Sequence, residues 1–210
     1  MDKRALFVLS LLAGVIFTGT PVRATIEMQT PKIVAQQSDL SQAVLSLQDL
    51  PPGFIEMPPE NLAPLKQIIT ERFPFKVESI SLFMNLQNGE FLMSVTMTLS
   101  EKARQAGRRL DQVDLREIIG PMMGGDPKVA EIEILEQKEL PQFNNIGESS
   151  AGLSTVARMR GIPVRADMGA FRRSEVFALT VLVYSNGDSP VTQLGDIARK
   201  LDARILQSSP

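Results

Sequence analysis

Large apolar side chains alternate with smaller or polar ones over residues 75–99, and this pattern predicts a β-hairpin. Asn88-Gly89 interrupts the alternation with a pair that is typical of a two-residue type I′ turn. With the turn centred there, Gln87 faces Glu90 and the apolar pairs fall on one face of the hairpin. The four expected pairs are Leu86 with Phe91, Met84 with Met93, Leu82 with Val95 and Ile80 with Met97. We expect the other face to be wet or lightly covered; it carries Ser79, Ser81, Asn85, Ser94, Thr96 and Thr98.

Helical and extended patterns alternate along the rest of the chain. Apolar residues at intervals of three and four predict helices over residues 60–73, 101–119 and 190–206. Alternating or continuous apolar runs predict further strands at residues 44–47, 129–140, 152–159, 162–172 and 175–184. The last of these is apolar on both faces, so we expect it at the centre of the sheet. This order of elements predicts an α+β fold, an antiparallel sheet of about six strands packed with three helices in an α/β sandwich.

The first residues of the chain have the features of a secretory signal peptide. The basic segment Asp2-Lys3-Arg4 precedes an apolar stretch at residues 5–19, and Val22 and Ala24 occupy the two recognition positions of a cleavage site. Because the apolar stretch is too short to cross a hydrocarbon core of about 30 Å, cleavage is favoured over a membrane anchor.

Three segments are therefore expected. Residues 1–24 form the signal peptide, residues 25–42 a flexible leader and residues 43–210 a single α+β sandwich domain. The protein is expected to be exported to a periplasmic, lumenal or extracellular location, without a stable membrane anchor after cleavage. The intact mass of envelope-purified protein tests this, because the chain should begin at Thr25 or, after a second candidate site, at Gln36.

The composition excludes several kinds of chemistry. The chain contains no Cys and no His, so disulfides, Cys/His zinc sites, c-type haem and catalytic units built on Cys or His are ruled out. Removing Lys3, Arg4, Arg23 and Asp2 with the signal peptide changes the net charge from -2 to -4. This acidic balance argues against nucleic acids and anionic membrane surfaces as partners.

Four short segments of the predicted domain carry recognisable motifs: residues 47–54 (LQDLPPGF), 146–152 (IGESSAG), 171–174 (FRRS) and 194–205 in the last helix. They resemble segments of secreted bacterial sensor-like domains of the PsbP-like α/β sandwich class. That family includes the extracytoplasmic domain of a mycobacterial Ser/Thr kinase and related lipoproteins, and a cyanobacterial relative would fit the resemblance. Glu148 stands where the family usually has Asp, Ser174 where it has Gly, and the cysteines of several relatives are missing. The resemblance implies a non-catalytic extracytoplasmic domain, often with a cleft whose ligand is unknown.

No catalytic, cofactor or metal site is expected. The segment at residues 147–152 differs by one residue from a G-x-S-x-G nucleophile elbow, but there is no His to activate Ser149. Two carboxylate groups offer ligands for a hard cation, yet their positions on a helix face and a strand are typical of solvated charge. These groups are Asp111, Asp114 and Glu117, and Glu131, Glu133 and Glu136. A hydrolase that uses only carboxylates is a remote alternative.

Arginines of the late strands form the candidate binding site. Arg158 and Arg160 share a strand face, and tight turns would bring them beside arginines of the neighbouring strands. Guanidinium groups bind carboxylates and phosphates bidentately, so the cluster predicts a small anionic ligand or the acidic face of an envelope protein. The alternative is a solvated sheet face paired with Asp167, Glu175 and the acidic N-terminal part. The five candidates are Arg158, Arg160, Arg165, Arg172 and Arg173.

Two function classes remain after these exclusions. The first is a non-catalytic extracytoplasmic binding or sensor-like module whose ligand or partner is unknown. The second is an accessory or assembly protein that docks on a membrane complex, as the PsbP-like resemblance implies. A ligand bound in a cleft would favour the first class, and co-purification with a membrane complex would favour the second.

Overall fold

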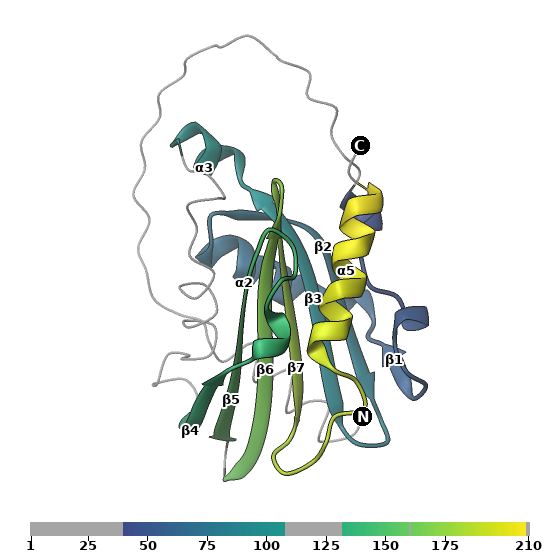
Figure 1. The fold of residues 1–210 in the computed structure, drawn as a ribbon. Coiled ribbons are helices and arrows are strands. Elements are labelled where there is room, and N and C mark those ends of the chain that lie inside the picture. Colours follow the sequence, from purple (N-terminus) through teal and green to yellow (C-terminus); the bar gives the residue numbers. More distant parts are fainter. Residues whose placement is uncertain (1–39, 108–131, 160, 209–210) are drawn as a thin grey trace.

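A seven-stranded antiparallel sheet forms the centre of the molecule (Figure 1). The computed structural model describes residues 40–107, 132–159 and 161–208; the expected signal peptide, most of the leader and the second half of the expected helix 101–119 lie outside these residues. The strand order is β1-β2-β3-β7-β6-β5-β4. The strands are β1 (Phe54–Glu56), β2 (Phe75–Asn85), β3 (Glu90–Leu99), β4 (Ile132–Glu139), β5 (Ser149–Met159), β6 (Ile162–Arg173) and β7 (Val176–Ser185). The α+β class and the antiparallel sheet are confirmed, and β7 is the middle strand, as its two apolar faces predicted.

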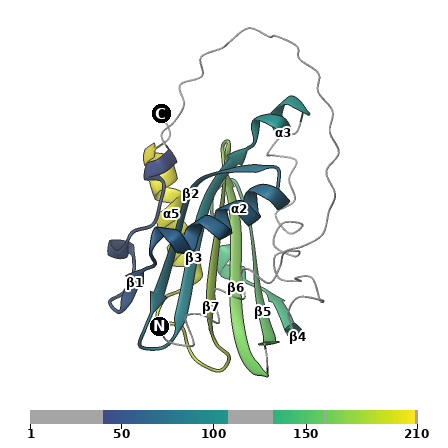
Figure 2. The same cartoon turned by 180° about the vertical axis from the view of Figure 1, so that it is seen from behind.

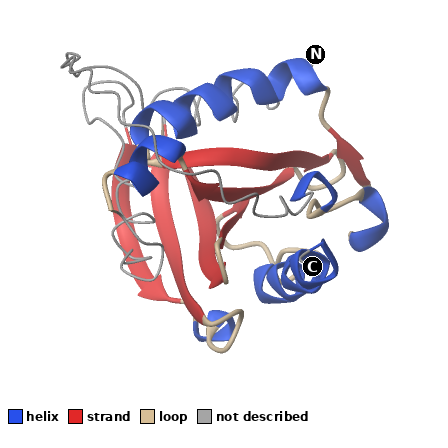
Figure 3. Ribbon diagram, turned by 90° about the horizontal axis from the view of Figure 1, so that it is seen from above, coloured by secondary structure: helices blue, strands red, loops and turns tan. Residues whose placement is uncertain are grey.

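Helices cover both faces of this sheet. Helix α2 (Leu62–Arg72) packs on one face and α5 (Leu194–Ser208) on the other, as Figures 2 and 3 show. A short helix α3 (Glu101–Gln105) follows β3, and 3-10 turns lie at η1 (Leu40–Gln42), η2 (Leu47–Asp49), η3 (Pro59–Asn61) and η5 (Pro141–Phe143). Two apolar clusters result, one under α2 and one under α5. The apolar stripe of α5 is what the three-and-four spacing of residues 190–206 predicted.

The β2-β3 hairpin exists, but its predicted register is wrong by two residues. Asn85 faces Glu90 and Met84 faces Phe91, so four residues rather than two connect the strands. The connection is closed by a hydrogen bond of 2.9 Å from the Gly89 amide to the Asn85 carbonyl, with Gly89 at a φ of 73°. Because a shift of two residues keeps every side chain on its own face, the apolar face is as expected. Leu86 is the exception, since it lies in the turn and is exposed.

The second face of the hairpin is buried, which corrects the expectation of a wet surface. The segment at residues 40–45 and α5 cover it. Its hydroxyl groups pair with each other: Ser81 Oγ lies 2.7 Å from Ser94 Oγ, and Ser79 Oγ lies 2.5 Å from Thr96 Oγ1. Serine and threonine are tolerated in this interior because each hydroxyl finds a hydrogen-bond partner.

The N-terminal segment is irregular where a strand was predicted at residues 44–47. It is held against α5 by Arg204, whose Nη2 donates to Asp49 Oδ2 at 2.8 Å and to Ser46 Oγ at 3.2 Å. Burial by itself raises the pKa of Asp49, but the hydrogen bonds from the Ser46 amide and from Arg204 outweigh it and bring this pKa below its usual value. The segment continues into β1, a strand that the sequence patterns did not reveal.

Two paired glycines on the α5 face receive the side chain of Phe143. Gly152 and Gly169 are opposite each other on β5 and β6, and the fully buried Phe143 ring lies over them. A Cβ on Gly152 would approach Phe143 Cβ to 2.8 Å, and a Cβ on Gly169 would overlap the ring itself. Glycine inside a strand is expected where another group approaches the backbone closely, and here that group fastens η5 to the sheet.

Candidate functional site

The candidate arginines do not form one cluster. Arg158 and Arg165 are diagonal neighbours on the α5 face of β5 and β6. Arg172 lies seven residues farther along β6 than Arg165, about 23 Å at 3.3 Å per residue, and points to the α2 face. The expectation that tight turns bring Arg165 and Arg172 together with Arg158 is therefore wrong, and Arg160 lies outside the described residues.

Each described candidate arginine already has a partner within the chain. Arg158 pairs with Glu133 of β4, and Arg172 Nη2 lies 3.3 Å from Glu148 Oε2. Arg173 is bound bidentately by Asp202 of α5, with Nε 2.8 Å from Oδ1. These pairs connect strands to each other and to α5. A ligand-binding role for the five arginines remains a prediction, and the structure provides no single surface for it.

The loop at residues 144–150 forms a shallow depression of about 570 Å³. Gly147 has a φ of 64°, and a Cβ there would collide with the Arg172 carbonyl. Glu148 Oε1 accepts a hydrogen bond of 2.9 Å from the Ser174 amide in the β6-β7 turn. The exposed Ser149 begins β5 at its side. The glycine and the carboxylate of this motif thus hold the loop against the β6-β7 turn.

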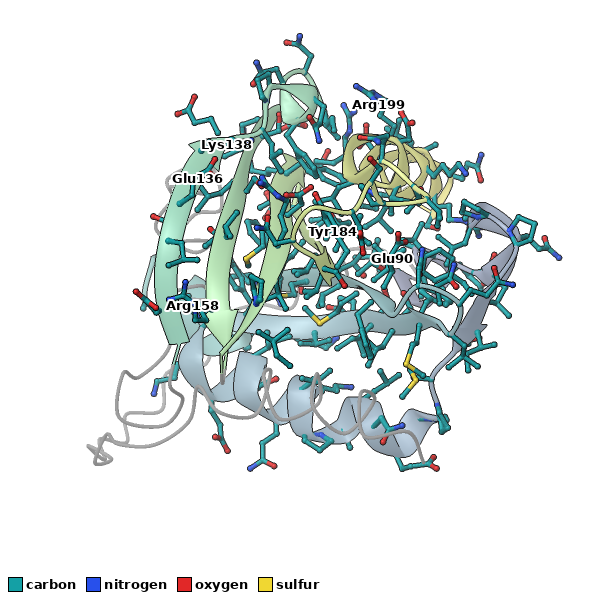
Figure 4. All side chains as sticks on the ribbon, turned by 90° about the horizontal axis from the view of Figure 1, so that it is seen from below. Glu90, Glu136, Lys138, Arg158, Tyr184 and Arg199 are labelled. Carbon is teal, nitrogen blue, oxygen red and sulfur yellow. The ribbon has the colours of Figure 1, made fainter. Side chains whose placement is uncertain are left out.

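A second group of polar residues lies inside the α5 face, at the opposite end of the sheet from this loop. We call it the Glu90 cluster; it consists of Glu90 on β3, Asp167 and Arg165 on β6, and Tyr184 on β7. Glu90 is 2% exposed, Asp167 6% and Tyr184 7%. Figure 4 shows Glu90 and Tyr184 in the interior, whereas Glu136, Lys138 and Arg158 lie toward the outer strands. Strand alternation places all four side chains on one face.

Hydrogen bonds satisfy only part of the cluster. The Tyr184 hydroxyl donates to Asp167 Oδ2 at 3.0 Å. Glu90 Oε1 accepts hydrogen bonds of 2.8 Å from the Val191 amide and from Asn88 Nδ2. In the described part of the chain, the second oxygens, Glu90 Oε2 and Asp167 Oδ1, are buried and have no hydrogen-bond partner. Burying such atoms costs desolvation free energy that no hydrogen bond offsets, and they are uncommon in folded proteins.

The electrostatics of the cluster are dominated by negative charge. Burial raises the pKa of Glu90, and the nearby charge of Asp188 adds to this rise, although hydrogen bonds from Val191 and Asn88 oppose it. Burial and the Asp167 carboxylate also raise the pKa of Tyr184, so the phenol stays protonated and donates. The guanidinium of Arg165 donates to Ser154 Oγ at 3.1 Å and to Asn186 Oδ1 at 3.5 Å. The cluster therefore contains two carboxylates and one guanidinium group.

In the described ranges, no set of three or more Asp or Glu residues is placed to hold a metal ion. What the cluster offers is a pair of buried acceptors beside a phenol donor that is already engaged.

The sequence patterns did not predict this cluster, although each of its acidic and phenolic residues stands out in the sequence. Asp167 is a carboxylate in the middle of an apolar strand, and Tyr184 is the only tyrosine of the chain. Glu90 immediately precedes the alternating apolar run of β3. The alternative to the arginine site pairs Asp167 with arginines on a solvated face, whereas the structure buries this carboxylate. Local alternation could not reveal that α5 and the segment at residues 186–191 would close over the face.

Comparison of the chain with protein-family models and with curated proteins finds no match in either. The resemblance to sensor-like and PsbP-like domains therefore stays a prediction. In the part of the chain that the structure describes, no helix has the length and apolar character needed to cross a membrane.

Proposed function

We propose that this protein is a non-catalytic, exported binding module that takes a small ligand at the Glu90 cluster. The observation that carries this proposal is the pair of buried carboxylate oxygens without partners on one face of the sheet. An interior that served stability alone would pair these atoms or replace them by apolar ones. Buried polar groups without partners are expected at functional sites, where a bound group can complete them.

The composition supports a binding role over a catalytic one. Without Cys or His, the chain lacks the side chains that most often act as nucleophile or general base near neutral pH. The exposed Ser149 lies at the far end of the sheet from the two carboxylates. We therefore propose binding and sensing rather than turnover, in the extracytoplasmic location that the signal peptide predicts.

A thermal-shift screen of the mature protein tests the proposed function. The panel should contain amines, sugars, carboxylates and phosphates, and each hit should be repeated with Glu90→Gln and with the matched surface variant Glu60→Gln. A ligand of the cluster raises the melting temperature of the wild type and of Glu60→Gln, but much less that of Glu90→Gln, because bound ligand stabilises only the form that binds it. A panel without hits, or hits that are indifferent to Glu90→Gln, would argue against this function.

A second candidate function, docking on a membrane complex as an accessory protein, has a separate observation in its favour. Ile134 and Leu135 are each 44% exposed on β4, the last strand of the described sheet. Exposed apolar residues on an edge strand are typical of surfaces that pair with another chain. Replacing Ile134 by Glu should abolish co-sedimentation with envelope membranes, whereas replacing the more exposed Ile162, which lies away from that edge, should not. Unchanged co-sedimentation of Ile134→Glu would exclude β4 as the docking site.

A further inference from the structure

We propose that Glu90 and Asp167 bind the ammonium group of a small organic ligand. This inference rests on the proposed binding function and names the chemical class of the ligand. Its starting point is that both missing partners are hydrogen-bond donors, since Glu90 Oε2 and Asp167 Oδ1 are acceptors. An ammonium group brings three donors on one atom, so one such group has donors enough for both carboxylates.

The charge of the cluster points to the same class of ligand. Glu90 and Asp167 each carry one negative charge when ionised, and Arg165 supplies one positive charge. Asp188, which acts on Glu90 from the turn after β7, adds a further negative charge. Negative charge around the two buried carboxylates therefore exceeds positive charge, and an ammonium group would reduce this excess. An anionic ligand would increase the imbalance, and a neutral hydroxyl would satisfy hydrogen bonds without relieving the charge.

The other neighbours of the two carboxylates do not supply this cation. Arg165 uses its guanidinium on Ser154 and Asn186. Tyr184 gives its only proton to Asp167 Oδ2. Asp188, the charged residue that acts on Glu90 from the following turn, is itself acidic. In the described residues, the electrostatic surroundings of Glu90 therefore favour an external cation.

Entry to the site requires movement of the segment at residues 186–191, because both oxygens are shielded from solvent in this structure. The segment is exposed at residues 185–189 and is attached to the cluster by few bonds. These are the Val191 amide to Glu90 Oε1 at 2.8 Å, the Asn186 amide to the Pro163 carbonyl at 3.3 Å and the long contact from Arg165. The same Glu90 that receives the ligand thus also holds the segment that covers it.

Titration of the wild-type protein with butylamine and with 1-butanol tests the inference, since the two probes differ only in the ammonium group. Binding is measured by calorimetry, and its position by the amide chemical shifts of Val191 and Asn88. We expect butylamine to bind and to shift both amides, and 1-butanol to do neither. Equal binding of the two probes, or no binding of butylamine at millimolar concentration, would overturn the ammonium assignment.

Two conservative variants then assign the atoms. Glu90→Gln and Asp167→Asn should each weaken butylamine binding at least about tenfold, the loss expected for one charge-assisted hydrogen bond, while Glu60→Gln leaves it unchanged. Thermal unfolding of each variant verifies that it is folded. Unchanged affinity in either folded variant would contradict the site.

The two proposals can fail separately. If a neutral or anionic compound from the screen shifts the Val191 amide and butylamine does not, the binding function stands and the ammonium class is wrong. If no compound shifts that amide, both proposals fail, and the buried oxygens are structural.

Discussion

Replacing Gly169 by Ala should destabilise the fold far more than an ordinary glycine-to-alanine change in a strand. The added Cβ would overlap the Phe143 ring, which is fully buried between η5, α5 and the sheet. The β6 backbone cannot easily shift away from the ring, because Gly169 is paired with Gly152 on one side and with Thr180 on the other. The ring must therefore leave its position, and the cost approaches that of truncating a buried Phe, about 3–5 kcal/mol.

The opposing contribution is small. Alanine restricts the unfolded chain and stabilises by about 0.4–1 kcal/mol at a compatible position, which does not offset the loss of ring packing. For a domain of this size the net change of about 2–4.6 kcal/mol corresponds to a fall in melting temperature of roughly 4–18 °C. Urea unfolding followed by circular dichroism measures the free energy, and differential scanning calorimetry measures the melting temperature.

A double-mutant cycle with Phe143→Ala shows whether the ring is the cause. In that background the ring is absent, so Gly169→Ala should cost less than about 1 kcal/mol. Equal costs in the two backgrounds would mean that the strain is in the strand itself. A cost below about 1 kcal/mol in the wild-type background would mean that η5 is not packed on the glycine pair as described.

Three further outcomes are expected. Burial raises the pKa of Glu90, so folding takes up protons at this carboxyl, and wild-type stability should decline as the pH rises from about 4.3 through the higher folded pKa. Glu90→Gln should therefore be more stable than the wild type at pH 8, and the urea midpoints of the two proteins should converge near pH 4. Arg204→Met should lower the free energy of unfolding by about 1–3 kcal/mol above pH 4 in the same assay. The difference from the wild type should shrink at lower pH, because Asp49, whose folded pKa is lowered, becomes protonated there. A difference that does not change with pH would exclude the ion pair as its source. Gly89→Val should lower the urea midpoint by the equivalent of at least about 1 kcal/mol, because a β-branched residue is strained at a φ of 73°, and an unchanged midpoint would contradict the turn conformation.

The hairpin shows which aspects of the fold the sequence could reveal. Alternation has a period of two, so it assigned every apolar residue of β2 and β3 to the correct face while leaving the register open to shifts of two residues. The choice between registers was made by the turn. Asn88-Gly89 suggested a two-residue connection, whereas the Asn85 side chain accepts from the Gln87 amide at 3.0 Å and favours a longer one.

The candidate site was less accessible to sequence reasoning than the sheet. The sequence predicted an anion-binding site because arginines are numerous in the late strands. Arg172 and Arg173, however, are adjacent residues of one strand and therefore point to opposite faces of the sheet. Each found a nearby acid in the folded chain, which local patterns do not specify. The burial of Glu90 and Asp167 depends on α5 and on the segment at residues 186–191, and could not be inferred from the strands that carry them.

The bond between Asp49 and Arg204 joins residues that are 155 positions apart, so forming it closes a long loop of the chain. The strands of the sheet are mostly hairpin neighbours, so they can pair while the chain is still being completed. The N-terminal turns have no such local partner, because α5 forms much of the surface on which they rest. We expect the serines and threonines beneath residues 40–45 to stay hydrated until that helix has packed, so closing this face should depend on contacts between distant parts of the domain.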